Sequence, residues 1–228
     1  MVSTGLPERL DTVAKRYDRE YRGESVEVPE SVEALPIFQD WVAGKLSSRL
    51  ASPFWEIAKP KKLQNCLDLG AGGSFLFYPC WREWDARFYG QDISSAICEL
   101  VNARGSQLNS KLYKGMRQAA AHQLDVYEPN QFDLAIATGV SCYYEWAYWD
   151  TVLSAVKKVL KSGSPFIFDV IDPDQPLAED WAILEMYLGA EVELMSIADW
   201  KRHLKAAGVT IKKEQEGELF HLFKVVLS

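Results

Sequence analysis

Hydrophobic and polar residues follow two different patterns along this 228-residue chain, and the change falls near Leu63. Before it, residues 7 to 22 place apolar and aromatic side chains three to four positions apart, which predicts an amphipathic helix. A second helical region is expected over residues 35 to 58, interrupted by Pro53. We therefore expect the first sixty residues to form a helical cap.

From Leu63 onward, short apolar runs alternate with longer segments of helical period, such as SSAICELVNAR, WDTVLSAVKKVLKSG and IADWKRHLKAAG. This alternation is typical of repeated βα units and of a parallel sheet. The last two apolar runs are separated by only a few residues around Gly217, too few for a crossover helix, so they should form an antiparallel hairpin. The pattern predicts strands at residues 63–68, 86–91, 119–124, 132–138, 165–170, 209–214 and 218–226.

These elements predict an α/β fold with a seven-stranded, mostly parallel sheet, a C-terminal antiparallel hairpin and an N-terminal helical cap. We expect a single domain over residues 1–228, with the cap at 1–59 and the α/β core at 60–228. Residues 172–196 form an insertion between the fifth strand and the next helix, and such insertions tend to shape binding pockets at strand ends.

Composition narrows the classes of partner. The chain has 25 Lys and Arg against 32 Asp and Glu, for a formal net charge of -7, and no basic patch in the sequence suggests nucleic acid as a partner. No segment has the length of a membrane span, and the N-terminus lacks the apolar region of a signal peptide, so we expect a cytoplasmic protein. Cys66, Cys80, Cys98 and Cys142 form no CxxC pair, which favours buried thiols over disulfides or a structural metal.

The segment LQNCLDLGAGGSFLFYP, residues 63–79, takes the chain from an apolar run into three glycines. Such a turn lets a ligand approach the backbone. A dinucleotide fingerprint would need glycine where Phe75 stands, and the Gly-Lys-Ser/Thr of a phosphate loop is absent. Asp68, just before the turn, would repel a pyrophosphate but suits a ligand with ammonium and sulfonium charges, such as S-adenosylmethionine.

At these residues the chain resembles the class I S-adenosylmethionine-dependent methyltransferases, whose first motif is an apolar strand, an acid and a glycine-rich turn, here CLDLGAGG. The resemblance covers about residues 63 to 227 and implies a Rossmann-like sheet, S-adenosylmethionine as cofactor and S-adenosylhomocysteine as product. It also expects acids after the next two strands, where Asp92 and Asp125 stand. Because ligands of open α/β sheets bind at the carboxyl ends of strands, three acids there favour a cofactor site.

The resemblance assigns roles to individual residues. Asp92 would hold the ribose, and the Gly70 carbonyl would hold the methionine amino group. Asp125 would bind the adenine amino group, with the backbone of Val126 on the ring. The further cofactor-binding residues that it implies are Asp68, Ala71, Gly72, Ile93 and Thr138, with Tyr17 and Tyr21 of the cap closing over the cofactor.

The acceptor is expected near the segment VSCYYEWAYWD, which holds five aromatic residues between Tyr143 and Trp149. The segment lacks the Asn/Asp-Pro-Pro-Tyr pattern that family members use for planar exocyclic amines, so a small-molecule acceptor with an O or N nucleophile is favoured over a DNA base or glutamine. Methyl transfer depends mainly on alignment, and a general base is optional. If a proton must be taken, Tyr143, Tyr144, Glu145 or His122 are the candidate catalytic residues.

Other interpretations of these residues stay open. Each acid has a structural explanation as a helix cap or turn residue, and the aromatic run has one as core packing. In the insertion, Asp172, Glu185 and Tyr187 are acceptor-side candidates that a solvated face would explain equally well. The alternative functions are a protein or RNA methyltransferase, a noncatalytic S-adenosylmethionine-binding protein and a nicotinamide-dependent oxidoreductase.

Overall fold

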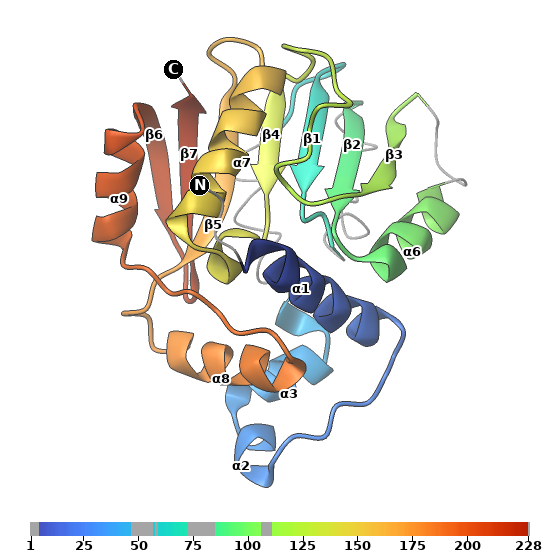
Figure 1. Ribbon diagram of the computed structural model, residues 1–228, viewed down its shortest axis with the longest axis vertical. Coiled ribbons are helices and arrows are strands. Elements are labelled where there is room, and N and C mark those ends of the chain that lie inside the picture. The colour runs from blue at the N-terminus through green and yellow to red at the C-terminus, as the bar shows by residue number, and fades with distance from the viewer. Residues whose placement is uncertain (1–4, 47–56, 58, 73–84, 106–110, 228) are drawn as a thin grey trace.

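The computed structural model describes residues 5–46, 57, 59–72, 85–105 and 111–227. Within them, one seven-stranded sheet runs in the order β3-β2-β1-β4-β5-β7-β6 (Figure 1). The pairs from β3 to β5 are parallel, and β7 is antiparallel to both β5 and β6. The α/β sheet with its C-terminal hairpin is therefore confirmed. The strands are β1 (Asn65–Leu69), β2 (Arg87–Asp92), β3 (Tyr113–Gln118), β4 (Leu134–Ala137), β5 (Pro165–Ile171), β6 (Val209–Glu216) and β7 (Phe220–Leu227).

The central strands are buried on both faces, as their continuous apolar runs predict. Leu67 of β1 belongs to the core cluster that also contains Trp149 of α7 (Trp146–Val159), whereas Cys66 packs in the cluster of Ile97 from α6 (Ser95–Gly105). Successive strand residues point to opposite faces, so α7 and α6 cover the two sides of the sheet. This double cover leaves the strand ends as the place where a ligand can reach the sheet.

The cap lies at one end of the sheet. α1 (Leu6–Tyr21) crosses the edge toward which the arrowheads of β1, β2 and β4 point (Figure 1). Beyond it, α3 (Pro36–Val42) contacts α8 (Ala178–Leu188), which belongs to the predicted insertion. Within the described residues, the other α-helices are α2 (Glu30–Glu33) and α9 (Ile197–Ala206).

The third strand was predicted at residues 119–124, and that prediction is wrong. The strand is β3, Tyr113–Gln118, and residues 119–124 form turns after it. β3 lies at the sheet edge, where Met116 alone is fully buried, so it lacks the apolar run that marks a central strand. The alanines after it, Ala119 to Ala121, produced a misleading apolar signal.

Several further predictions concern segments near the cap and the turn. The helix expected at residues 7 to 22 is confirmed as α1. Pro53, Gly73, Phe75 and Cys80 lie outside the described residues. The three cysteines within those residues are buried and free. None of the helices in the described part of the chain combines the length and apolar character that a membrane span requires.

Candidate functional site

The glycine turn after β1 packs so tightly against its neighbours that only glycine fits at position 70. Gly70 has φ +62°, and a Cβ there would lie 2.5 Å from Val140 Cγ2 and 2.9 Å from the carbonyl oxygen of Thr138. The N–H of Gly70 donates to the carbonyl of Gln91 at the end of β2, at 2.8 Å. The turn is thereby held against two neighbouring strand ends with its backbone open to the cavity.

Asp92 at the end of β2 connects this turn to the next one. Its Oδ2 accepts from the N–H of Gly72 at 2.9 Å, and its Oδ1 accepts from the N–H of Ser94 at 2.8 Å. The side chain is buried, and burial raises the pKa of this carboxyl to about 6. Asp92 does not cap α6, because Ser94 Oγ accepts from the N–H of Ile97 and performs that role.

α1 is attached beside Asp92 through Asp18. The Asp18 carboxylate accepts from Ser94 Oγ at 2.6 Å, from Ser95 Oγ at 3.0 Å and from the N–H of Ala96 at 2.9 Å. At the other side of α1, Arg9 donates to the carbonyl of Tyr143 at 2.9 Å. These bonds hold α1 across the strand ends and close a cavity beneath it.

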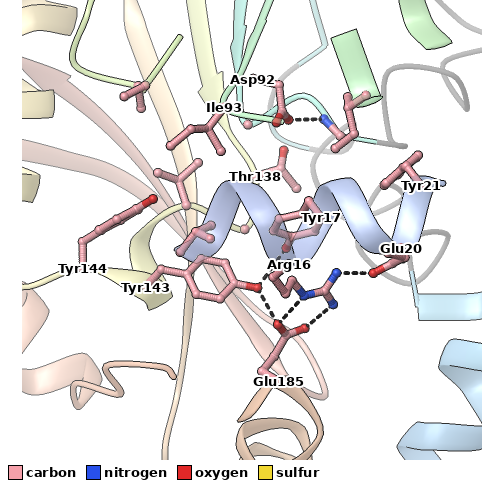
Figure 2. Close-up of a pocket in the computed structure, with 18 of the residues that line it drawn as sticks. Arg16, Tyr17, Glu20, Tyr21, Asp92, Ile93, Thr138, Tyr143, Tyr144 and Glu185 are labelled. Carbon is pink, nitrogen blue, oxygen red and sulfur yellow. Dashed lines mark hydrogen bonds and ion pairs between the residues drawn. The ribbon is translucent and has the colours of Figure 1, made fainter. Parts of the chain in front are cut away.

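The cavity encloses about 1280 Å³, part of it open to solvent. Its floor is formed by the glycine turn, by Asp92 and Ile93, and by residues 138–140 after β4. Figure 2 shows Asp92 at one end and the Arg16–Glu185 pair at the other, with Thr138 and Tyr17 between them.

A buried polar network stands at the far end of the cavity. Arg16 of α1 donates through Nε and Nη2 to the two carboxylate oxygens of Glu185 on α8, both at 2.8 Å, and it also pairs with Glu20. The hydroxyl of Tyr143 donates to Glu185 Oε2 at 2.8 Å, and the hydroxyl of Tyr17 lies 2.9 Å from that of Tyr143 (Figure 2). The network therefore joins the cap, the insertion and the loop after β4.

Burial keeps the two tyrosine hydroxyls of this network protonated. Burial and the neighbouring carboxylate of Glu185 raise the pKa of Tyr143 well above its usual value. Burial likewise raises the pKa of Tyr17 well above its usual value, despite the opposing effect of Arg16. Both phenols are protonated at neutral pH, so neither serves as a ready base in this arrangement.

The structure brings most of the predicted site residues together. Those that line the cavity are Tyr17, Tyr21, Gly70, Gly72, Asp92, Ile93, Thr138, Tyr143, Tyr144 and Glu185. Asp68 and Ala71 are fully buried beside it instead of lining it. Glu145 is exposed and lines a smaller cavity that Gly5, Arg9 and Glu193 share.

Asp125 and Val126 do not line the cavity. Both are exposed, since β3 ends at Gln118 and the chain passes through turns before it reaches them. Residues 119–121 line the cavity in their place. His122 is also outside it, with Nδ1 3.3 Å from the hydroxyl of Tyr148, and burial lowers the pKa of this imidazole.

Sequence reasoning missed Arg16, Glu20 and Trp181, which line the cavity from α1 and α8. Arg16 precedes the predicted Tyr17, and Glu20 follows one helical turn later, so they lie on the same helix surface. The sequence could have indicated them, because Arg16 and Glu20 form a charged pair on the face of α1 that carries the predicted tyrosines. Trp181 could have been found from the predicted insertion, because it lies on α8 one helical turn before Glu185, which the sequence had already suggested.

Residues 67–168 match the model of a methyltransferase domain. No curated protein matches the chain at a significant level.

Three solved structures share the fold over most of the chain. Geranyl diphosphate C-methyltransferase from Streptomyces coelicolor A3(2), in complex with Mg²⁺, geranyl diphosphate and S-adenosyl-L-homocysteine, has a TM-score of 0.69 at 14% identity, covering 96% of this chain and 98% of that one. A geranyl diphosphate methyltransferase in complex with GPP and sinefungin has a TM-score of 0.67 at 13% identity, with coverages of 97% and 100%. The pyocyanin biosynthetic protein PhzM has a TM-score of 0.66 at 11% identity, with coverages of 86% and 60%.

Proposed function

We propose that this chain, which contains a methyltransferase domain with the fold of the class I S-adenosylmethionine-dependent methyltransferases, transfers a methyl group to a small-molecule acceptor. The observation that carries the proposal is the continuous cavity under α1. It joins the glycine turn and Asp92 at one end to an aromatic and polar chamber at the other. We take the N-terminal cap and the α/β core as one functional domain, because the cap supplies one wall of this cavity.

The residues at the strand ends fit S-adenosylmethionine. The turn at Gly70 packs closely on Val140 and the Thr138 carbonyl, and Gly70 and Gly72 line the cavity. The Asp92 carboxylate, 20 positions after Gly72 in the chain, accepts a hydrogen bond from the N–H of Gly72. Asp92 would hold the ribose hydroxyls, as carboxylates at this place in open α/β sheets do. The backbone at Gly70 and Thr138 would hold the methionine end. When bound, the cofactor supplies a methyl group activated by its sulfonium.

The acceptor would occupy the chamber beside Tyr143, Tyr144 and Trp181. These rings are buried and supply flat apolar walls that can orient a small molecule. Alignment of donor and acceptor in such a site supplies about 7–11 kcal/mol of the barrier reduction. Of the predicted catalytic residues, we retain Tyr143 and Tyr144 as acceptor-positioning groups and leave out Glu145, which lies outside the cavity.

Thermal unfolding with S-adenosylmethionine, S-adenosylhomocysteine and NADH in parallel tests the cofactor assignment. A ligand at about 100 times its dissociation constant adds about 2.7 kcal/mol of stability. We expect a rise in Tm with the two adenosyl ligands and none with NADH. A rise with NADH alone, or no rise with any of the three, would contradict the proposal.

The acceptor class is tested separately with methyl-labelled S-adenosylmethionine and a cell extract divided by size. We expect the label in the small-molecule fraction. Label in protein or RNA would favour the alternative of a macromolecular acceptor. Cofactor binding without transfer into either fraction would favour a noncatalytic binding protein.

A further inference from the structure

The charges around the cavity favour an acceptor that is not an anion. Among the described lining residues, the charged side chains are Arg16, Glu20, Asp92 and Glu185. Arg16 is the one cation of this set, and two carboxylates already hold its guanidinium. A phosphate or carboxylate entering this end would have to displace Glu185 or Glu20 from Arg16 and face their charges.

The hydroxyl pair beside Glu185 offers lone pairs to the cavity. Tyr143 donates its one hydroxyl proton to Glu185 Oε2, so the contact of 2.9 Å between the tyrosines must be donated by Tyr17. Each phenol has one proton, and both protons are then used within the chain. Because burial raises the pKa of both phenols, this direction is kept at neutral pH. The pair accepts hydrogen bonds from a ligand and has none to donate.

This pair lies close to the backbone at Gly70 and Thr138, which would hold the methionine end of the cofactor and thus its methyl group. A Cβ built on Gly139 would lie 4.0 Å from the hydroxyl of Tyr17, and Gly139 directly follows Thr138, which packs against Gly70. Asp92 lies at the opposite end of the cavity (Figure 2). The hydroxyl pair therefore belongs to the methyl end and not to the ribose end.

We propose that the methyl acceptor is a primary or secondary amine, whose N–H is received by the Tyr17–Tyr143 hydroxyl pair. The inference rests on the proposed function and specifies its acceptor. The rings of Tyr144 and Trp181 around this end also favour a cationic or neutral ligand, since aromatic faces attract ammonium groups.

The transfer balances without any further reactant. The uncharged amine nitrogen donates its lone pair to the methyl carbon, and a new carbon–nitrogen bond forms. The carbon–sulfur bond breaks and leaves its electron pair on sulfur, which becomes a neutral thioether. Since the amine is an ammonium ion in water before and after the reaction, one proton passes to water per methyl transferred.

Four probes with one phenethyl frame test the acceptor class: 2-phenylethylamine, 2-phenylethanol, 3-phenylpropanoate and 2-phenylethyl phosphate. Their binding to the full chain saturated with S-adenosylhomocysteine is measured by calorimetry, and methyl transfer is measured with S-adenosylmethionine. We expect the amine to bind at least about tenfold more tightly than either anion, because a like-charge contact costs more than that factor. Tighter binding of an anion, or no preference for the amine, overturns the inference. If S-adenosylhomocysteine itself does not bind, the result contradicts the proposed function and not the choice of an amine acceptor.

Matched tyrosine variants test the hydroxyl pair. We expect Tyr143→Phe to weaken amine binding about tenfold, the factor for one lost hydrogen bond to a charged group, and to leave the affinity for S-adenosylhomocysteine unchanged. Tyr127→Phe is the control, because its ring packs on Phe132 outside the cavity. Tyr17→Phe provides a second variant, which should weaken amine binding by a similar factor. If the variants lose S-adenosylhomocysteine affinity and keep the amine preference, the pair binds the cofactor and the inference is wrong.

Discussion

Replacing Gly70 with alanine tests whether the turn is a cradle shaped by contact with its neighbours. The added Cβ would stand 2.5 Å from Val140 Cγ2 and 2.9 Å from the Thr138 carbonyl oxygen, at a backbone φ of +62°. Gly208→Ala is the matched control. It has a similar φ of +73°, but a Cβ there meets nothing within 4 Å. The difference between the two variants isolates the contact from the backbone strain.

The expected losses of stability follow from the backbone strain and the steric contact. A left-handed conformation costs an alanine about 1–2 kcal/mol, and the stiffer unfolded chain offsets about 0.4–1 kcal/mol of it. Gly208→Ala should therefore lose about 1 kcal/mol. Gly70→Ala should lose a further 1–3 kcal/mol, about the cost of overpacking a well-filled site. For a chain of this length, each kcal/mol lowers Tm by about 2–4 °C.

The assay is thermal unfolding of the wild type and both variants, with and without S-adenosylhomocysteine. We expect Gly70→Ala to unfold about 6–12 °C below the wild type, to unfold clearly below Gly208→Ala, and to lose most of the ligand-induced rise in Tm. Gly208→Ala should keep that rise. Equal losses in the two variants, with the ligand effect intact in both, would refute the argument that the turn is shaped to receive a ligand.

Three further predictions concern buried charges and the attachment of α1. Burial raises the pKa of Asp92 to about 6, so the folded protein binds this proton more strongly than the unfolded chain, and wild-type stability falls as the pH rises from about 4 to 6. Asp92→Asn should remove about 3 kcal/mol of this pH dependence in urea titrations and should weaken S-adenosylhomocysteine binding at least about tenfold. Burial also raises the pKa of Asp169 to about 7, so the variant should keep the part of the pH dependence of stability that Asp169 causes. If Asp92→Asn left the pH dependence of stability unchanged, the assignment of this dependence to Asp92 would be wrong. Glu185→Leu should destabilise the protein by about 3–5 kcal/mol because it leaves the buried Arg16 charge with one carboxylate fewer, whereas Arg16→Met combined with Glu185→Leu should recover much of this loss in a double-mutant cycle. Asp18→Ala should raise amide hydrogen exchange in α1 and cost about 1 kcal/mol, and unchanged protection of α1 would show that other contacts hold it.

Local pattern was sufficient where one segment carries the whole signal. The continuous apolar runs of β1, β4 and β5 predict strands buried on both faces, and the spacing within residues 7 to 22 predicts α1. The glycine turn and Asp92 were recognisable for the same reason. A turn that excludes Cβ atoms and an acid at a strand end are each defined by a few neighbouring residues.

The local sequence pattern gave wrong predictions where contacts with residues distant in the chain decide the structure. β3 pairs on one side alone, so its alternating half-exposed residues resembled a loop more than a strand. Asp125 follows an apolar run like the other acids, but that run is a turn, and the acid is exposed. An acid after an apolar run belongs to the site only if the run is a strand that ends at the same edge.

The sequence by itself determined the central strands of the sheet, the helix α1 at its edge and the glycine turn, because hydrophobic periodicity and glycine conformation act within a few residues. Only the tertiary structure decided the acceptor end of the cavity. Arg16 and Glu185 lie 169 positions apart in the chain, and their two hydrogen bonds form because α1 and α8 pack at the same edge of the sheet. The partner of a buried charge is set by which helices meet, and no local pattern in either helix contains that information.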